Sequence, residues 1–522
     1  MDRQRRQFLL HAGQLAALAA AGGGLAVRAA PGGAYPFSLG VASGSPLPES
    51  VILWTRILAD PLLAGATPPI ALAVRWEVAE DEGFTRLAAA GSATALPALA
   101  HSVHVDVSGL APARWYWYRF MLGDAVSPVG RTRTAPAPDA LPERLRLAVA
   151  SCQHWEFGCY GAHRQIAAAA PDLVAFLGDY IYEWGPYQLQ HPSHAQRVDE
   201  SFTLDQYRAR YAQYKSDPDL QAAHRAAPWI VTWDDHEVAN DYANDRDERL
   251  AADFPLRRAC AYQAFYEHMP LRLAAPGGRR FDSLRMHQRY DWGRLARFHV
   301  LDDRQYRAHQ ACAPAGRGGS GSVTNKACAQ LRDPGRSMLG GEQEAWLAAG
   351  LAGSKARWNV IAQQTLMAQA SQLPLSKPGD GRFWTDGWDG YPVARERLLG
   401  ALRASGASNP LVLSGDVHSF YATELRLDFD RPVSARNPVI ATEFCGTSVT
   451  STSRPQARTQ QYVDMNSHIK FGRSDKRGFM LVELTPAQAT STFMAMENVH
   501  DAASAARALA VFTVRDGTAG LA

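Results

Sequence analysis

The chain has 522 residues, which is long for one ordinary domain and makes two domains the natural expectation. Hydrophobic residues make up 46% and charged residues 20%, which is typical of globular proteins with ample material for a core. The first 29 residues carry the whole formal charge of +3, so the rest of the chain is neutral. This neutrality argues against nucleic acid as an obligatory partner.

Residues 1–29 are predicted to be a twin-arginine export signal. Arg5 and Arg6 precede a short run of small and weakly apolar residues at 15–27, which matches the charged and apolar regions of an export signal. The arginine pair followed by Phe-Leu resembles signals that carry folded cargo. A membrane anchor is the alternative, but three glycines at 22–24 make the apolar run short and only weakly hydrophobic. We therefore expect export machinery as a partner, a periplasmic or secreted location, and no stable membrane span.

Residues 37–133 are predicted to form a separate β-sandwich domain. Short strand-like runs separated by Pro and Gly are typical of an antiparallel sandwich. They occur at 51–55, 72–78, 104–107 and 115–120. The proline-rich segment 135–143 is expected to be a stiff linker.

Residues 144–500 are predicted to form a layered α/β (α+β) domain, followed by a C-terminal tail at 501–522. Strand-like and helix-like patterns alternate in this region, which favours packed α/β layers. Strands are expected at 145–150, 173–177, 229–233, 298–301, 358–362, 411–413, 439–444, 479–484 and 490–496. Helices are expected at 161–170, 204–214, 342–351 and 393–402.

Two of these strands end in candidate metal ligands. Cys152 follows the first strand, and Asp179 and Tyr182 follow the second. In α/β sheets, ligands gather at the carboxyl ends of strands. A single Asp at such a place more often caps a helix or a turn. A carboxylate, a phenolate and a thiolate together would suit ferric iron.

Two further strands end in the same way. Asp235, His236 and Asn240 follow one of them, where a histidine beside metal-binding groups could protonate a leaving group. An acidic loop that caps the next helix is the alternative. Asp416 and His418 follow the other, and their separation by one residue places both on one face of an extended segment. Four such strand ends together indicate a metallohydrolase.

Two loops have more than one interpretation. Arg304 follows the strand at 298–301, where it could bind phosphate oxygens or hold the loop through an Arg–Asp pair. The aromatic loop that contains Trp384, Trp388 and Tyr391 is expected to be an ordinary packed loop, with a cleft wall as the alternative.

The six cysteines permit disulfides in an oxidising compartment. Cys312 and Cys328 flank a Gly/Ser-rich loop and are the expected pair. Cys159 and Cys260 could be buried thiols or a second disulfide.

An ordered set of motifs resembles the PhoD-type alkaline phosphatases. The resemblance runs from about Phe37 to past Phe479 and rests on residues 37–46, 53–56, 151–153, 178–182, 233–237, 301–307, 414–419 and 443–448. It implies a small β-sandwich followed by a metallophosphatase-like domain of two sheets flanked by helices. It also implies twin-arginine export, hydrolysis of phosphomonoesters and phosphodiesters, and a site with Fe³⁺ and Ca²⁺.

The resemblance also implies roles for individual residues. The iron environment would comprise Cys152, Asp179, Tyr182 and His418, and Asp179 would bridge to calcium. The calcium-side ligands would be Asp235, Asn240 and Asp416. His236 would lie near the scissile phosphate. Asp303 departs from the pattern because the family more often has a small hydroxyl residue there, which weakens a catalytic role for Arg304; Cys445 is also unusual in its loop.

The leading hypothesis is therefore an exported, metal-dependent alkaline phosphatase or phosphodiesterase that uses a metal-activated water or oxo group against a small-molecule or polymeric phosphate ester. The alternative is a phospholipase D-like or teichoic-acid-type phosphodiesterase. A non-catalytic cell-envelope binding module is the remote alternative.

Overall fold

The computed structural model describes residues 35–61, 67–187, 194–195, 198–276, 280–375, 377 and 379–522. The predicted export signal lies outside these residues. Within the described part of the chain, no helix is long and apolar enough to cross a membrane.

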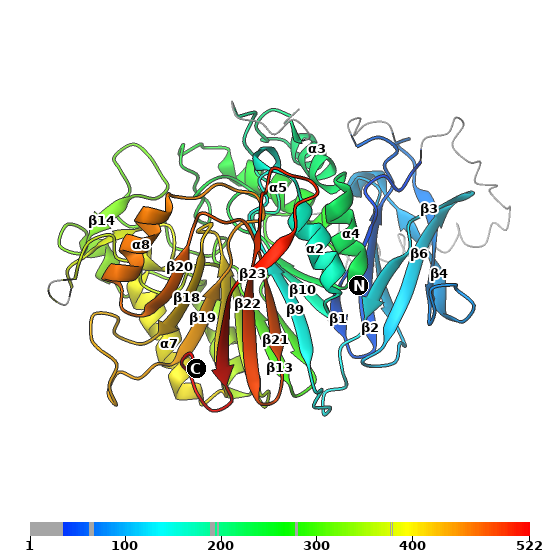
Figure 1. Cartoon of the computed structure of the whole chain (residues 1–522). Coiled ribbons are helices and arrows are strands. Elements are labelled where there is room, and N and C mark those ends of the chain that lie inside the picture. The colour runs from blue at the N-terminus through cyan, green and yellow to red at the C-terminus, as the bar shows by residue number, and fades with distance from the viewer. Residues whose placement is uncertain are drawn as a thin grey trace, which may run out of the picture.

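Two large sheets pack face to face (Figure 1). The nine-stranded sheet has the order β23 (Ala506–Arg515), β22 (Gln488–Met496), β21 (Gly478–Leu484), β9 (Leu145–Ala150), β10 (Leu173–Leu177), β11 (Trp229–Thr232), β1 (Val41–Leu47), β2 (Ser50–Arg56) and β5 (Ser102–Ser108). The seven-stranded sheet has the order β12 (Gln288–Trp292), β13 (Ala296–Val300), β15 (Trp358–Thr365), β17 (Pro410–Gly415), β19 (Ala441–Cys445), β18 (Phe420–Leu425) and β20 (Ile469–Arg473). A core of buried Leu, Val, Ala and Phe side chains from both sheets lies between them.

Parallel strands at the centre of each sheet direct their carboxyl ends to the same edge. β9, β10 and β11 run parallel in the larger sheet, and β13, β15, β17 and β19 run parallel in the smaller one. The loops that follow these strands build the functional site. The observed bounds of β9 and β10 are those predicted from their apolar runs.

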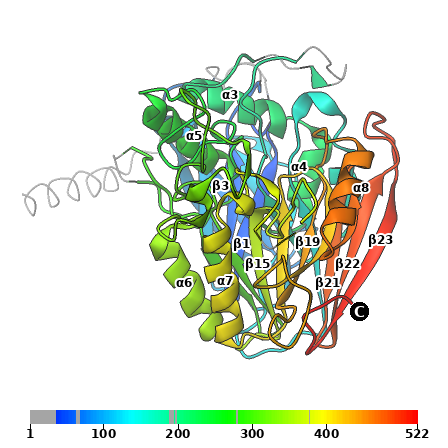
Figure 2. The same cartoon turned by 90° about the vertical axis from the view of Figure 1, so that its left-hand side faces the viewer.

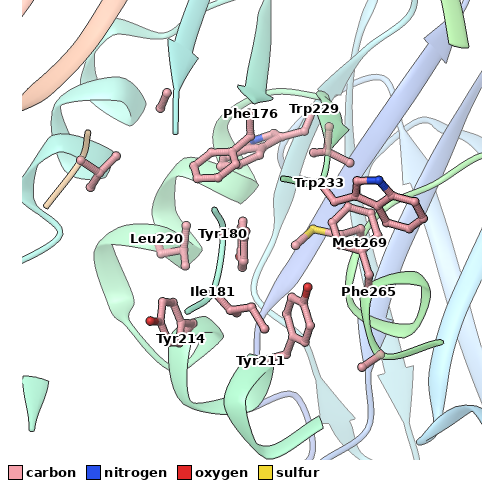
Figure 3. Close-up of a cluster of buried hydrophobic side chains, with 14 of the residues drawn as sticks. Phe176, Tyr180, Ile181, Tyr211, Tyr214, Leu220, Trp229, Trp233, Phe265 and Met269 are labelled. Carbon is pink, nitrogen blue, oxygen red and sulfur yellow. The ribbon is translucent and has the colours of Figure 1, made fainter. Parts of the chain in front are cut away.

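Helices cover the outer face of each sheet. The larger sheet is covered by α2 (Gly161–Ala169), α3 (Leu204–Lys215), α4 (Pro218–Ala226) and α5 (Phe254–His268), which pack through an aromatic cluster (Figure 3). The smaller sheet is covered by α6 (Gly340–Ala352) and α7 (Pro392–Ser405), which lie side by side in Figure 2. α8 (Gln456–Met465) packs on β20. Short 3₁₀ helices occur at Pro97–Leu99, Trp155–Phe157, Ala329–Arg332 and Trp388–Gly390.

The N-terminal β unit shares a sheet with the rest of the chain. Strands β1, β2 and β5 pack against a five-stranded sheet of β4 (Leu87–Ala95), β3 (Leu72–Ala79), β6 (Trp115–Leu122), β7 (Ala125–Val126) and β8 (Gly130–Arg133). β1 also pairs in parallel with β11, opposite Trp229 at Gly44. A Cβ atom at Gly44 would lie 2.7 Å from the Trp229 carbonyl oxygen, so only glycine permits this approach. One layer of the sandwich therefore continues the large sheet.

The α/β fold class is confirmed, with two small additions. Residues 506–515, expected within a tail, form edge strand β23 against β22. β14 (Ser322–Thr324) and β16 (Arg382–Trp384) form a two-stranded antiparallel sheet beside the site.

Candidate metal centre and active site

The predicted ligands converge where the central strands of both sheets end. Cys152 follows β9, Asp179 follows β10, and Asp416 and His418 follow β17. All four residues have a left-handed backbone, with φ between 53° and 61°. Non-glycine residues adopt this conformation at a cost, and such strain concentrates at functional sites. The strand ends are therefore bent sharply so that these side chains point toward one another.

Among the described residues, four overlapping groups of side chains could each hold a metal ion. Within each group the ligand atoms lie within 4.8 Å of one another. The groups are Cys152–Asp179–His418, Asp179–Asp235–His236, Asp234–Asp235–Asp416 and Asp235–Asp241–Asp386. Asp179 belongs to two groups and Asp235 to three, so these two carboxylates lie where neighbouring ions would be bridged.

Unsatisfied carboxylate oxygens show that the groups fit metal ions. Oδ1 of Asp179 and Oδ2 of Asp234 are buried and have no hydrogen-bond partner among the described residues. A buried anionic oxygen without a partner is costly, and a bound cation removes that cost. Burial, followed by the charges of Asp386 and Asp235, raises the pKa of Asp241 to about 8, because these carboxylates are crowded together.

Tyr182 lies beside the group that contains the Cys152 thiol. Its hydroxyl donates to Asp179 Oδ2 at 2.8 Å and lies 3.2 Å from Nε2 of His418. Ser451 Oγ donates to the same phenol oxygen at 2.7 Å. Thiol, phenol, imidazole and carboxylate therefore meet at one end of the centre, while the other end offers mainly carboxylates. An ion that accepts sulfur and nitrogen ligands is therefore expected at the first end, and an ion that prefers oxygen ligands at the second.

His236 is held by a carboxylate that the sequence did not single out. Its Nδ1 lies 2.8 Å from Oε2 of Glu183, and its ring lies 4.1 Å from that of Tyr182. Burial disfavours the charged ring, but Asp235, Asp179 and Glu183 outweigh burial and raise the pKa of His236. Asn240 joins this arrangement through its backbone N–H, which donates to Oε1 of Glu183 at 2.7 Å.

Glu237 ties two strand ends together. Its carboxylate accepts backbone N–H groups of Asp179, Tyr180 and Asp234 at 3.1, 2.6 and 2.7 Å. Gly178 makes the approach possible, because a Cβ there would lie 2.4 Å from Cβ of Asp234. Glu237 belongs to the Trp-Asp-Asp-His-Glu motif, so its motif was a signal for this role.

Arg304 lies behind the metal groups and contacts their carboxylates. It is fully buried, donates to Asp234 and to Asp386 at 2.6 Å, and lies 3.4 Å from Asp235 and 3.9 Å from Asp416. These contacts favour the expectation of an Arg–Asp pair over direct contact with phosphate. Asp386, which lies within the aromatic loop, was not among the residues predicted for the site.

The aromatic loop both packs and lines the site. Trp388 and Tyr391 are buried, whereas Trp384 is 49% exposed and lines a cleft of about 440 Å³. Asp416 and His418 open into the same cleft. A phosphate ester can therefore reach the metal groups from this side.

The disulfide of the structure is the one expected from the sequence. Cys312 and Cys328 form a disulfide, and Cys152 is a buried free thiol within the centre. No disulfide joins Cys159 and Cys260, so the alternative of a second disulfide between them is wrong.

Comparison with known proteins identifies the family. Residues 147–493 match the PhoD-like phosphatases, and residues 23–136 match the N-terminal domain of PhoD-like phosphatases. The chain belongs to the PhoD-like phosphatase family. It is 43% identical to alkaline phosphatase D of Bacillus subtilis (strain 168), over 99% of this chain and 88% of that protein.

A solved structure of PhoD has the same fold. The TM-score is 0.87 at 42% identity, and the match covers 95% of this chain and 93% of the other. The prediction of a phosphoric ester hydrolase of the PhoD-like family is thereby confirmed, and a non-catalytic binding module is set aside.

Proposed function

We propose that this PhoD-like phosphatase is an exported enzyme that uses Fe³⁺ and Ca²⁺ to hydrolyse phosphate monoesters and diesters. The observation that carries the proposal is the set of four overlapping ligand groups at the floor of an open cleft. Cys152, Asp179, Tyr182 and His418 would hold iron. Asp235, Asn240 and Asp416 would hold calcium, with Asp241 and Asp386 beside them. When bound, such ions polarise phosphoryl oxygens and supply a nucleophile at moderate pH.

Side chains of the protein itself hold the carboxylates in place and supply a proton to the leaving group. The contact between Nδ1 of His236 and Glu183 leaves Nε2 to donate a proton to the departing alkoxide or to stabilise its charge. Arg304 and Arg307 bind Asp386 from behind, which keeps the carboxylates fixed during turnover. The cleft is larger than a phosphate group needs, which supports esters with a sizeable organic part.

Paired chromogenic substrates test this function. Purified protein with calcium at alkaline pH should release nitrophenol from p-nitrophenyl phosphate and from bis(p-nitrophenyl) phosphate, and elemental analysis should find iron and calcium. Diester turnover well above monoester turnover would point to the lipid or polymer phosphodiesterase alternative. Absence of turnover of both esters by metal-loaded protein would contradict the proposal.

Export is supported by the signal-like N-terminus and by the Cys312–Cys328 disulfide, which suits an oxidising compartment. Replacing both Arg5 and Arg6 with Lys should retain the protein in the cytoplasm, as measured by cell fractionation. Unchanged export of that variant would contradict the twin-arginine route.

A further inference from the structure

The loop at 451–454 is fastened directly to the metal centre. Ser451 Oγ donates to the Tyr182 phenol oxygen, and the Thr452 carbonyl lies 2.6 Å from Nδ1 of His418. Three consecutive residues of the loop are thus anchored, since Ser453 Oγ lies 3.1 Å from Ser419 Oγ. The next residue, Arg454, is therefore held at a fixed place relative to the proposed ligands.

Arg454 lies on a wall shared by two cavities. The active-site cleft and a neighbouring cavity of about 460 Å³ have the loop residues Thr452, Ser453 and Arg454 in common. Asp416 and His418 line the same cleft as Arg454. An ester whose phosphate reaches the metal groups would have its organic part in the same cleft as Arg454.

The charge of Arg454 is not balanced by a carboxylate. Within the described residues Arg454 forms no ion pair, and its guanidinium lies 5.0 Å from the centre of the Tyr462 ring. Arg458 lies 5.1 Å from the same ring, so two positive charges share one aromatic neighbour. Asp389, another carboxylate of the cleft, is already paired with Arg395 at 2.7 Å. The cleft wall formed by the 451–454 loop thus bears an arginine that has no ion-pair partner among the described residues.

A guanidinium that has no ion-pair partner can bind a carboxylate or a phosphate through two parallel hydrogen bonds. We propose that Arg454 is a specificity-determining residue that binds a second anionic group on the organic part of the substrate. This inference rests on the proposed function. The preferred substrates are then phosphate esters that carry a further carboxylate or phosphate, in preference to esters with a neutral organic part.

A matched pair of probes tests the inference. sn-Glycerol 3-phosphate has a neutral organic part, and 3-phosphoglycerate replaces one hydroxymethyl carbon by a carboxylate. The ratio of kcat/KM for 3-phosphoglycerate over glycerol 3-phosphate should fall at least tenfold in Arg454→Gln, mainly through KM for the anionic ester. Arg454→Lys should retain part of the ratio. High salt should lower the ratio in the wild-type enzyme only.

Arg458→Gln is the control, because Arg458 contacts the same ring without lining the cleft. It should leave the ratio unchanged. If the enzyme accepts only diesters, the p-nitrophenyl esters of the same two phosphates replace the probes. An equal ratio in wild type and Arg454→Gln, with turnover of both probes intact, would overturn the inference alone. Loss of turnover of every ester by the wild-type enzyme would instead overturn the proposed function.

Discussion

Oε2 of Glu183 lies 2.8 Å from Nδ1 of His236 and fixes the orientation of that ring at the edge of the metal groups. The other oxygen of Glu183 accepts the backbone N–H of Asn240. One carboxylate therefore positions both the proposed proton donor and the loop that carries a proposed calcium ligand.

Replacing Glu183 with Gln should lower kcat by about 10- to 100-fold, the range typical of groups that orient residues at a metal site. The variant also removes one of the charges that raise the pKa of His236, so the ring should lose its proton at lower pH. The alkaline limb of the kcat/KM profile should move to lower pH. Glu497→Gln, at an exposed ion pair, is the control. A uniform loss of rate with an unmoved alkaline limb would contradict this role.

Tyr182→Phe should remove any visible absorption band that arises from phenolate bound to iron. The hydroxyl lies beside the group with Asp179 and His418, where iron is proposed. The measurement is the visible spectrum of the iron-loaded protein. Tyr180→Phe provides a matched control, because that hydroxyl contacts His224 instead. A band that survives in Tyr182→Phe would exclude Tyr182 as a ligand.

Arg304→Gln should destabilise the fold by about 3–5 kcal/mol, because loss of one partner leaves buried charges uncompensated. Asp234, Asp235 and Asp386 all lie within 3.4 Å of the guanidinium. Metal ions bound by the variant should offset part of the loss, so chelation should lower its melting temperature more than that of wild type. A stable variant with full metal content and a raised KM alone would indicate direct phosphate binding.

Asp303→Asn should stabilise the protein at alkaline pH. Burial raises the pKa of Asp303 to about 8, well above its usual value, so the folded state holds a proton that the unfolded state releases. The wild type therefore loses stability as pH rises from about 4 to about 8, whereas the variant does not. The gain in unfolding free energy should exceed about 1 kcal/mol at pH 9 and should be small at pH 4.

Asp302→Asn is the contrasting variant. Oδ1 of Asp302 accepts the backbone N–H groups of Arg304 and Gln305, and Oδ2 accepts the side-chain Nε2–H of Gln305 at 2.9 Å. The NH₂ group of an asparagine would face that Gln305 donor, so the replacement should destabilise the protein. Urea titrations at several pH values give both free energies. A pH-independent effect of Asp303→Asn would contradict burial of an ionisable carboxyl.

Local pattern predicted the central strands and the ligands that directly follow them. β9 and β10 are short apolar runs with clear ends, so Cys152 and Asp179 could be placed from sequence. Asp386 could not, because its partners Arg304 and Arg307 are about 80 residues away in the chain. Edge strand β23 alternates weakly, and its pairing with β22 becomes visible only when the sheet is assembled.

The pairing of β1 with β11 has a consequence for the order in which the chain is made. The N-terminal β unit leaves the ribosome first, with the open edge of β1 exposed. β11 emerges much later and closes that edge at Gly44. Until then, the edge of β1 is a template on which a strand of another chain can pair.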